Sequence, residues 1–192
     1  MDSDEELFRQ WQRGDASALE TIVQRYHRPL LAHLYRLTGN VQCAEDLVQE
    51  AFVRLVREAQ SYHYPRPFMP WFYTIARRLA LTERTSAYHR HTELKAELPE
   101  PAQHEPDPAE WVERWEQQRG LHLALARLSF EQREVLSLRY GQELSVKETA
   151  ELLGIPPGTV KSRTFTALRL LREMLELETL SSAEKRGDQH NG

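Results

Sequence analysis

The stretch that decides the fold is SVKETAELLGIPPGTVKSR, residues 145–163. Ser145 and Glu148 have the spacing of a capping box, in which an N-cap side chain and the residue three positions later satisfy each other's free backbone amides. Pro156-Pro157-Gly158 opens a second helix, whose first turn does not need the N–H group that proline lacks. Residues 145–172 are therefore predicted to form a helix-turn-helix, in which the required small, turn and inward positions are Ala150, Gly154 and Val160.

The second helix of this motif is expected to have two unlike faces. Its buried side is predicted to consist of Val160, Thr164, Ala167, Leu168 and Leu171, and the opposite side of Gly158, Lys161, Ser162, Phe165 and Arg169. An exposed phenylalanine beside lysine and serine suits a DNA major groove, where Phe165 can contact a thymine methyl and Lys161 an acceptor edge. The alternative is a helical hairpin whose basic face is only solvated.

Upstream of the motif, amphipathic runs predict further helices. The first begins after Asp15 and ends at Gly39-Asn40, and Pro29 is expected to bend or interrupt it. The second run, from Ala44 onward, predicts a helix with one buried and one exposed side. Its apolar side is Leu47, Val48, Ala51, Phe52, Leu55, Val56 and Ala59, of which Leu47, Val48, Ala51 and Leu55 are expected to be buried. Its other side is Asp46, Gln49, Glu50 and Arg57.

A third run, beginning near Phe68 to Trp71, interleaves aromatic residues with arginines. Tyr73, Arg77 and Arg84 are placed on one side of this helix, and Trp71, Phe72 and Ile75 on the other. This mixture suits strand separation, because cations hold phosphates and aromatic faces receive unstacked bases. The alternative is that the large aromatic side chains, Trp71 above all, belong to the core.

The helical pattern fails between about Thr92 and Pro108, where prolines stand among acidic residues. This composition predicts a semi-rigid linker. Capping boxes at Asp107–Glu110 and Ser129–Gln132 then begin new helices. No strand alternation is present, so we expect an all-α protein of two small helical domains joined by a Pro/acid-rich linker. The predicted parts are domain 1–91, linker 92–110, domain 111–178 with the helix-turn-helix, and a polar tail 179–192.

Composition excludes several classes of protein. A net charge of −4, from 25 basic and 29 acidic residues, argues against a strong free-standing nucleic-acid binder, although residues 159–172 carry four basic residues and no acid. The single Cys43, the acidic N-terminus and the lack of a long apolar stretch predict a cytoplasmic protein without membrane insertion. His89, His91 and His104 are the only candidate metal group, so neither a metal, a cofactor nor an enzyme is expected.

Two further stretches of sequence are informative together with residues 145–163: AEDLVQEAFVRL (residues 44–55) and PWFYTIARRLAL (residues 70–81). In this order with residues 145–163, they resemble the extracytoplasmic-function (ECF) sigma factors of the sigma-70 family. These are the bacterial RNA polymerase subunits that select promoters. The resemblance covers roughly residues 5–90 and 115–175.

The resemblance implies a role for each string. Residues 44–55 would dock on the polymerase clamp through Asp46, Gln49 and Glu50. Residues 70–81 and the end of their helix would melt and read the −10 region through Trp71, Tyr73, Arg77, Arg78 and Arg84. The helix-turn-helix would read the −35 region through Gly158, Thr159, Lys161, Ser162, Arg163, Phe165 and Arg169.

The function implied is that of an alternative sigma factor, which directs transcription initiation at a restricted stress-type regulon. Its partners would be the RNA polymerase core, at its clamp and flap, promoter DNA, and an anti-sigma factor. Three positions depart from the family: Arg78 stands where asparagine is usual, Thr82 where aspartate or asparagine is usual, and Thr166 where arginine is frequent. The alternative function is a helix-turn-helix regulator without polymerase as an obligate partner, which leaves the two N-terminal strings unexplained.

Overall fold

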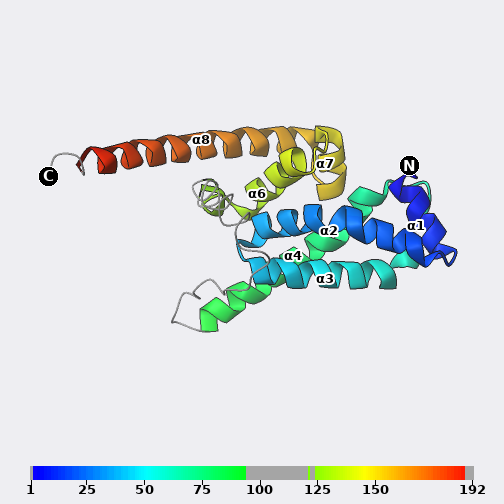
Figure 1. Cartoon of the computed structure of the whole chain (residues 1–192). Helices are drawn as coiled ribbons and strands as arrows, with labels where there is room; N and C mark the ends of the chain where they lie inside the picture. The colour runs from blue at the N-terminus through cyan, green and yellow to red at the C-terminus, as the bar shows by residue number, and fades with distance from the viewer. Residues whose placement is uncertain (1, 94–120, 122–123, 189–192) are drawn as a thin grey trace.

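The structure is a computed structural model that describes residues 2–93, 121 and 124–188. Its regular elements within these ranges are helical: α1 (Asp4–Gln12), α2 (Ala16–Thr38), α3 (Val41–Arg57), the 3-10 turn η1 (Ala59–Ser61), α4 (Phe68–Glu93), α6 (Phe130–Leu136), the π-type turn η2 (Ser137–Gly141), α7 (Val146–Leu153) and α8 (Pro157–Asp188). Helices α1–α4 form an N-terminal lobe, and α6–α8 form a C-terminal lobe that lies along one side of it (Figure 1). The long α8 projects well past the rest of the molecule.

Local capping sets several of the helix ends, as the sequence predicts. The Asp15 side chain accepts a hydrogen bond from the Ser17 amide and starts α2, which ends at Gly39 in the left-handed conformation. Asn40 then caps α3. The capping boxes at Ser129 and Ser145 are both present at the starts of α6 and α7. The box expected at Asp107–Glu110 lies outside the described residues.

Two features of the N-terminal lobe differ from the pattern read in the sequence. Pro29 does not interrupt α2, because Tyr26, Leu30 and Leu34 on either side of it are buried in one core. That packing outweighs the cost of about 3 kcal/mol that a proline imposes inside a helix. In addition, a helix that the sequence analysis did not predict, α1, precedes α2 and buries Leu7 and Phe8.

Aromatic packing between α1 and α4 forms the centre of the N-terminal lobe. The ring of Phe8 lies 4.9 Å from that of Phe68 and 5.3 Å from that of Trp71, measured between centroids. The Glu5 carboxylate accepts a hydrogen bond of 3.0 Å from the Phe68 amide, so α1 also caps the first turn of α4. The start of α4 is therefore fixed by contacts more than sixty residues away in the chain.

The two lobes share one hydrophobic core and a set of polar contacts. Phe130, Val135, Leu138, Leu144 and Val160 belong to the same buried cluster as the core of the N-terminal lobe. Around it lie hydrogen bonds from one lobe to the other: Arg77 to Glu134 at 2.8 Å, Arg84 to Glu131 at 2.9 Å, Tyr73 to Gln142 at 2.6 Å, His33 with Ser137 at 2.8 Å, and Gln142 to the Pro29 carbonyl at 3.2 Å. The lobes of the free chain are thus packed together.

Candidate nucleic-acid interface

The helix-turn-helix has the geometry that its sequence predicts. Gly154 ends α7 with φ +66°, a conformation that residues with a Cβ rarely adopt. The Ile155 amide then donates to the Ala150 carbonyl at 3.1 Å, which closes the turn between the helices. Pro157 is the first residue of α8, and Val160 is fully buried. These contacts fix the angle at which α8 leaves the turn.

The outward face of α8 presents a mixture of basic, hydroxyl and aromatic side chains. Phe165 is 70% exposed, although it is a large hydrophobic residue in the middle of a well-formed helix turn. Around it, the residues predicted to share this face are all exposed: Gly158, Lys161, Ser162 and Arg169. Thr159 and Arg163 are partly buried at its edges. The face has the composition expected for reading base edges in a major groove.

One residue that was predicted to be buried on α8 is exposed. Leu168 has 42% of its surface exposed, whereas Ala167 and Leu171 are buried against α6 in a small cluster of the C-terminal lobe. The cluster is completed by Ala124 and Leu128, which precede α6, and by Leu136 of α6, and it includes Ala167 and Leu171 but not Leu168.

Ion pairs on α8 leave its basic groups available. Arg169 lies 3.8 Å from Glu173 and Arg172 lies 3.5 Å from Glu176, and all four side chains are more than half exposed. Exposed pairs of this type contribute little, about 0.3–0.5 kcal/mol. A nucleic-acid phosphate can therefore replace either carboxylate at small cost.

The aromatic string of α4 is buried. Trp71, Phe72 and Tyr73 each have less than a tenth of their surface exposed, so the alternative of a core role for Trp71 holds in this structure. The sequence predicts Tyr73 on the same side of α4 as Arg77 and Arg84. It does lie on their side of α4, but His33 packs against its ring and Gln142 accepts a hydrogen bond from its hydroxyl. Burial raises the pKa of Tyr73, which keeps the phenol neutral and able to donate.

The arginines of α4 differ in their surroundings. Arg77 is held by Glu134, whose side chain is only 1% exposed, and Arg84 is held by Glu131 while its guanidinium lies 5.0 Å above the Phe130 ring. Arg78 is exposed. Burial raises the pKa of Glu134, although the nearby Arg77 guanidinium acts in the opposite direction.

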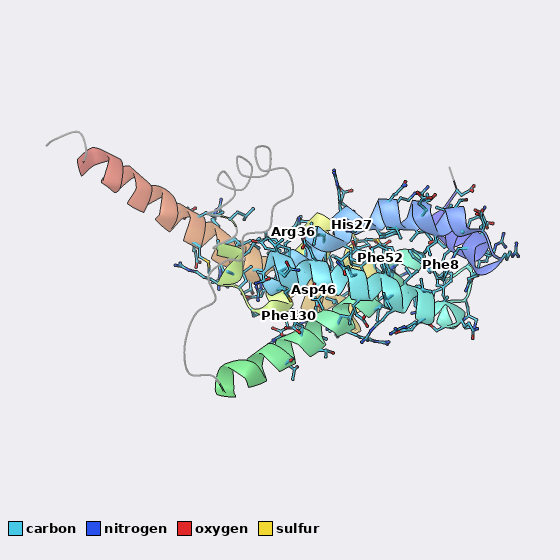
Figure 2. The ribbon with its side chains drawn as sticks, turned by 60° about the horizontal axis from the view of Figure 1, so that its bottom comes forward. Phe8, His27, Arg36, Asp46, Phe52 and Phe130 are labelled. Carbon is cyan, nitrogen blue, oxygen red and sulfur yellow. The ribbon has the colours of Figure 1, made fainter. Side chains whose placement is uncertain are left out.

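A third surface lies on α3. Asp46 and Gln49 are exposed on its outward side, where Figure 2 labels Asp46, and Glu50 is half exposed and paired with Arg54 at 2.9 Å. Val53 and Val56 are 41% and 46% exposed. Neither is predicted as a site residue, and the sequence pattern is wrong to place Val56 with the apolar side of this helix. With Asp46 and Gln49 they recur every three or four residues, which is the spacing of a helix stripe that packs against a partner helix. That spacing was the signal in the sequence.

The described residues offer no other site. They contain no group of three or more His, Cys, Asp or Glu side chains arranged to hold a metal, and no helix among them is long and apolar enough to cross a membrane. The candidate metal group at His89, His91 and His104 lies outside the residues whose side chains are described.

Comparison with known proteins identifies the family. The family model described as Sigma-70 region 2 matches residues 22–90, and the model described as Sigma-70, region 4 matches residues 124–173. The ECF RNA polymerase sigma factor SigW of Bacillus subtilis is 33% identical over 175 residues, which cover 87% of this chain and 94% of SigW. The chain belongs to the ECF sigma factors. It is therefore an alternative sigma factor, a non-enzymatic transcription initiation factor that recognises promoters with RNA polymerase.

Other relatives of this sigma factor agree. The ECF sigma factor BldN of Streptomyces coelicolor is 32% identical over 171 residues, which cover 88% of this chain but only 65% of BldN. Two solved structures show the same fold. CnrH in complex with the cytosolic domain of CnrY has a TM-score of 0.69 at 22% identity and covers 92% of this chain and 99% of its own. RpoE of Bartonella quintana in complex with NepR has a TM-score of 0.65 at 23% identity and covers 82% and 96%.

Between the lobes of this sigma factor, His33 is buried without a carboxylate partner. It shares its one described hydrogen bond with the Ser137 hydroxyl, and the Arg36 guanidinium lies nearby. Burial lowers the pKa of His33 to about 3, and the charge of Arg36 adds to the effect. The imidazole is therefore neutral at physiological pH.

This burial predicts a loss of stability in acid. The unfolded chain binds a proton at His33 below about pH 6.5, whereas the folded chain does not until about pH 3. Protonation of His33 therefore favours the unfolded state between these two values. The free energy of unfolding is highest above pH 6.5 and decreases as the pH falls. Urea unfolding should show the free energy of unfolding falling by about 1.4 kcal/mol more per pH unit below 6.5 in the wild type than in His33→Asn. Equal slopes for the two proteins would show that His33 takes up a proton in the folded state.

Proposed function

We propose that this sigma factor divides its task among three surfaces. The exposed stripe of α3 docks on the clamp of core polymerase, the arginines and Tyr73 of α4 melt and read the −10 region, and the outward face of α8 reads the −35 region. The observation that carries the proposal is Phe165, 70% exposed among Lys161 and Ser162 at the front of a fixed helix-turn-helix. The combination suits a major groove, where Phe165 can contact a thymine methyl while Lys161 and Ser162 hydrogen-bond to base edges.

The sequence boundaries fit this division. Residues 1–91 would carry the clamp and −10 surfaces and residues 111–178 the −35 surface and the contact with the flap, with 92–110 as linker and 179–192 as a polar tail. Trp71 then supports the −10 surface from within the core, because its ring packs on Phe8 and Tyr62. Gly158, Thr159, Arg163 and Arg169 would position the recognition helix on phosphates.

The partners and setting follow from the same reading. CnrH is described in complex with the cytosolic domain of CnrY, and the sigma factor RpoE is described in complex with the anti-sigma factor NepR. We infer that an anti-sigma factor also restrains this chain, that it acts in the cytoplasm, and that it serves a restricted stress-type regulon. A regulator without polymerase is disfavoured, because it gives no role to the stripe of α3, in which Val53 and Val56 are exposed beside Asp46.

Docking predicts a specific effect of charge reversal on α3. The family resemblance implies that this side of α3 docks on a basic clamp helix. Asp46→Lys should therefore weaken binding to core polymerase at least about tenfold, because it places a cation against that surface. The matched control, Glu20→Lys, changes an exposed acid of α2 by the same charge and should bind as the wild type does. Binding is measured by competition for fluorescent core.

Transcription of fragmented genomic DNA with core polymerase, followed by mapping of the transcript starts, should yield discrete promoters for the wild type and the control. Equal core affinity for all three proteins would remove this surface from the proposal.

The α8 face predicts two kinds of effect on promoter binding. Phe165→Ala should cost about 1–3 kcal/mol at one −35 position, whereas Arg169→Ala should weaken all sequences alike and reduce the salt slope by about one. Holoenzyme binding to a mapped promoter, with each −35 position changed in turn and at several salt concentrations, separates the two. A Phe165→Ala protein that weakens every promoter equally would show that Phe165 does not face a base.

Arg78 predicts an unusual −10 interaction. A guanidinium can pair with a phosphate or stack on an unstacked base, and the exposed side chain is free to do either. Arg78→Ala should therefore slow open-complex formation without changing core binding, and Arg78→Asn should sharpen base discrimination at one −10 position. Transcription from a randomised −10 library measures both, with Arg13→Ala as the control for loss of an exposed arginine. Identical opening rates and base preferences would place Arg78 away from DNA.

A further inference from the structure

The C-terminal lobe covers the part of α4 that the proposed function assigns to DNA. Arg77 and Arg84 donate to Glu134 and Glu131 of α6, and the Tyr73 hydroxyl donates to Gln142 just after η2. The Phe130 ring lies beneath the Arg84 guanidinium, where α6 meets α4 (Figure 2). Each of these contacts joins residues that are 46 or more positions apart in sequence, so the folding of the two lobes brings them together.

The carboxylates that α6 places against Arg77 and Arg84 are chemically similar to the phosphates that DNA would place there. A carboxylate and a phosphate both accept charge-assisted hydrogen bonds from a guanidinium, and one guanidinium edge holds only one of them at a time. We propose that the free protein is closed by its own C-terminal lobe, with Glu131 and Glu134 occupying the positions of DNA phosphates on α4, so that −10 DNA binds only after the lobes separate. This inference rests on the proposed role of α4.

The closure is selective. Lys161, Ser162 and Phe165 remain exposed on α8 in the closed chain, so the proposed −35 surface is available. On the proposed −10 surface, by contrast, Tyr73, Arg77 and Arg84 are engaged by the C-terminal lobe, and Arg78 alone of its arginines is left without such a contact among the described residues. A closed sigma factor is thereby kept from holding single strands on its own, but its recognition helix is not masked. Strand binding, rather than duplex binding, is the step that closure controls.

The closed state is built to be reversible. Glu134 is buried, yet its second carboxylate oxygen has no hydrogen-bond partner, so the lobe contact carries an unrepaid desolvation cost. The pair of Arg84 with Glu131 is about half exposed on both sides and is screened by salt. The closed state is maintained by the hydrophobic core that the lobes share, and by the high effective concentration of two lobes on one chain, rather than by these ion pairs.

The test removes the two carboxylates from the full-length protein. Glu131→Gln/Glu134→Gln keeps the side-chain shapes and removes the charges. The matched control, Glu143→Gln/Glu151→Gln, removes two exposed acids of the same lobe for which no ion pair with α4 is described. Spin labels on cysteines introduced at the exposed positions Gln60 and Lys147, in a Cys43→Ser background, report the distance between the lobes by pulsed electron resonance. Circular dichroism confirms that each variant is folded.

We expect one narrow distance distribution for the wild type and the control, and an added population of longer distances for Glu131→Gln/Glu134→Gln. Affinity for a short fluorescein-labelled single strand of random sequence should rise about fivefold in that variant and not in the control. The rise should disappear when Arg77→Ala and Arg84→Ala are added. The binding of a duplex by α8 should be the same in all the variants.

A charge exchange keeps the test decisive if the first variant is unstable. Glu131→Arg alone should open the lobes, and Arg84→Glu/Glu131→Arg should close them again without restoring strand binding. Unchanged distances in every carboxylate variant would overturn the closure. Lobes that separate with no gain in strand binding would overturn the gating, and would assign the failure to the proposed DNA role of α4 rather than to the lobe contact.

Discussion

The structure depends on one turn of α4 that is aromatic on three consecutive positions. Trp71, Phe72 and Tyr73 project about 100° apart around the helix, so together they need apolar surroundings over most of its circumference. Trp71 finds them in α1 through Phe8, and Phe72 in α2 and α3 through Tyr26 and Phe52. The third side, that of Tyr73, is completed by His33 and by Gln142 of the other lobe. The N-terminal lobe alone therefore does not fully enclose its central helix.

The parts of the fold that could be predicted are those that short-range interactions determine. Asp15, Gly39, Ser129, Ser145 and Gly154 mark helix ends in the structure because each cap is satisfied within a few residues of the chain. The burial of Leu47, Val48 and Ala51 followed from helical periodicity for the same reason. Family resemblance added the assignment of surfaces, and family models match both lobes.

What could not be predicted depends on partners that are distant in the sequence. The amphipathic pattern of α4 placed Tyr73 correctly beside Arg77, but no local signal shows that residues 131–142 cover them. The exposure of Leu168 likewise depends on which side of α8 the distant Ala124, Leu128 and Leu136 cover. Helix α1 was missed because its nine residues are mostly polar. Local pattern thus gives the faces of a helix, whereas the partner of each face is a property of the whole chain.

In the proposed mechanism, α4 meets two environments, the carboxylates of α6 and the phosphates of DNA, and the chemistry of the lobe contact follows from both. If the side chains at Arg77 and Arg84 were apolar, the closed state would be more stable, because buried ion pairs rarely surpass well-packed hydrophobic residues. The same side chains would then have nothing to offer a phosphate. Arginines serve both states only when the covering lobe presents acids, and this explains why Glu134 is buried at a cost where a leucine would be expected. The ionic character of the contact is thus a consequence of using one surface for two anionic partners, the carboxylates of α6 and the phosphates of DNA.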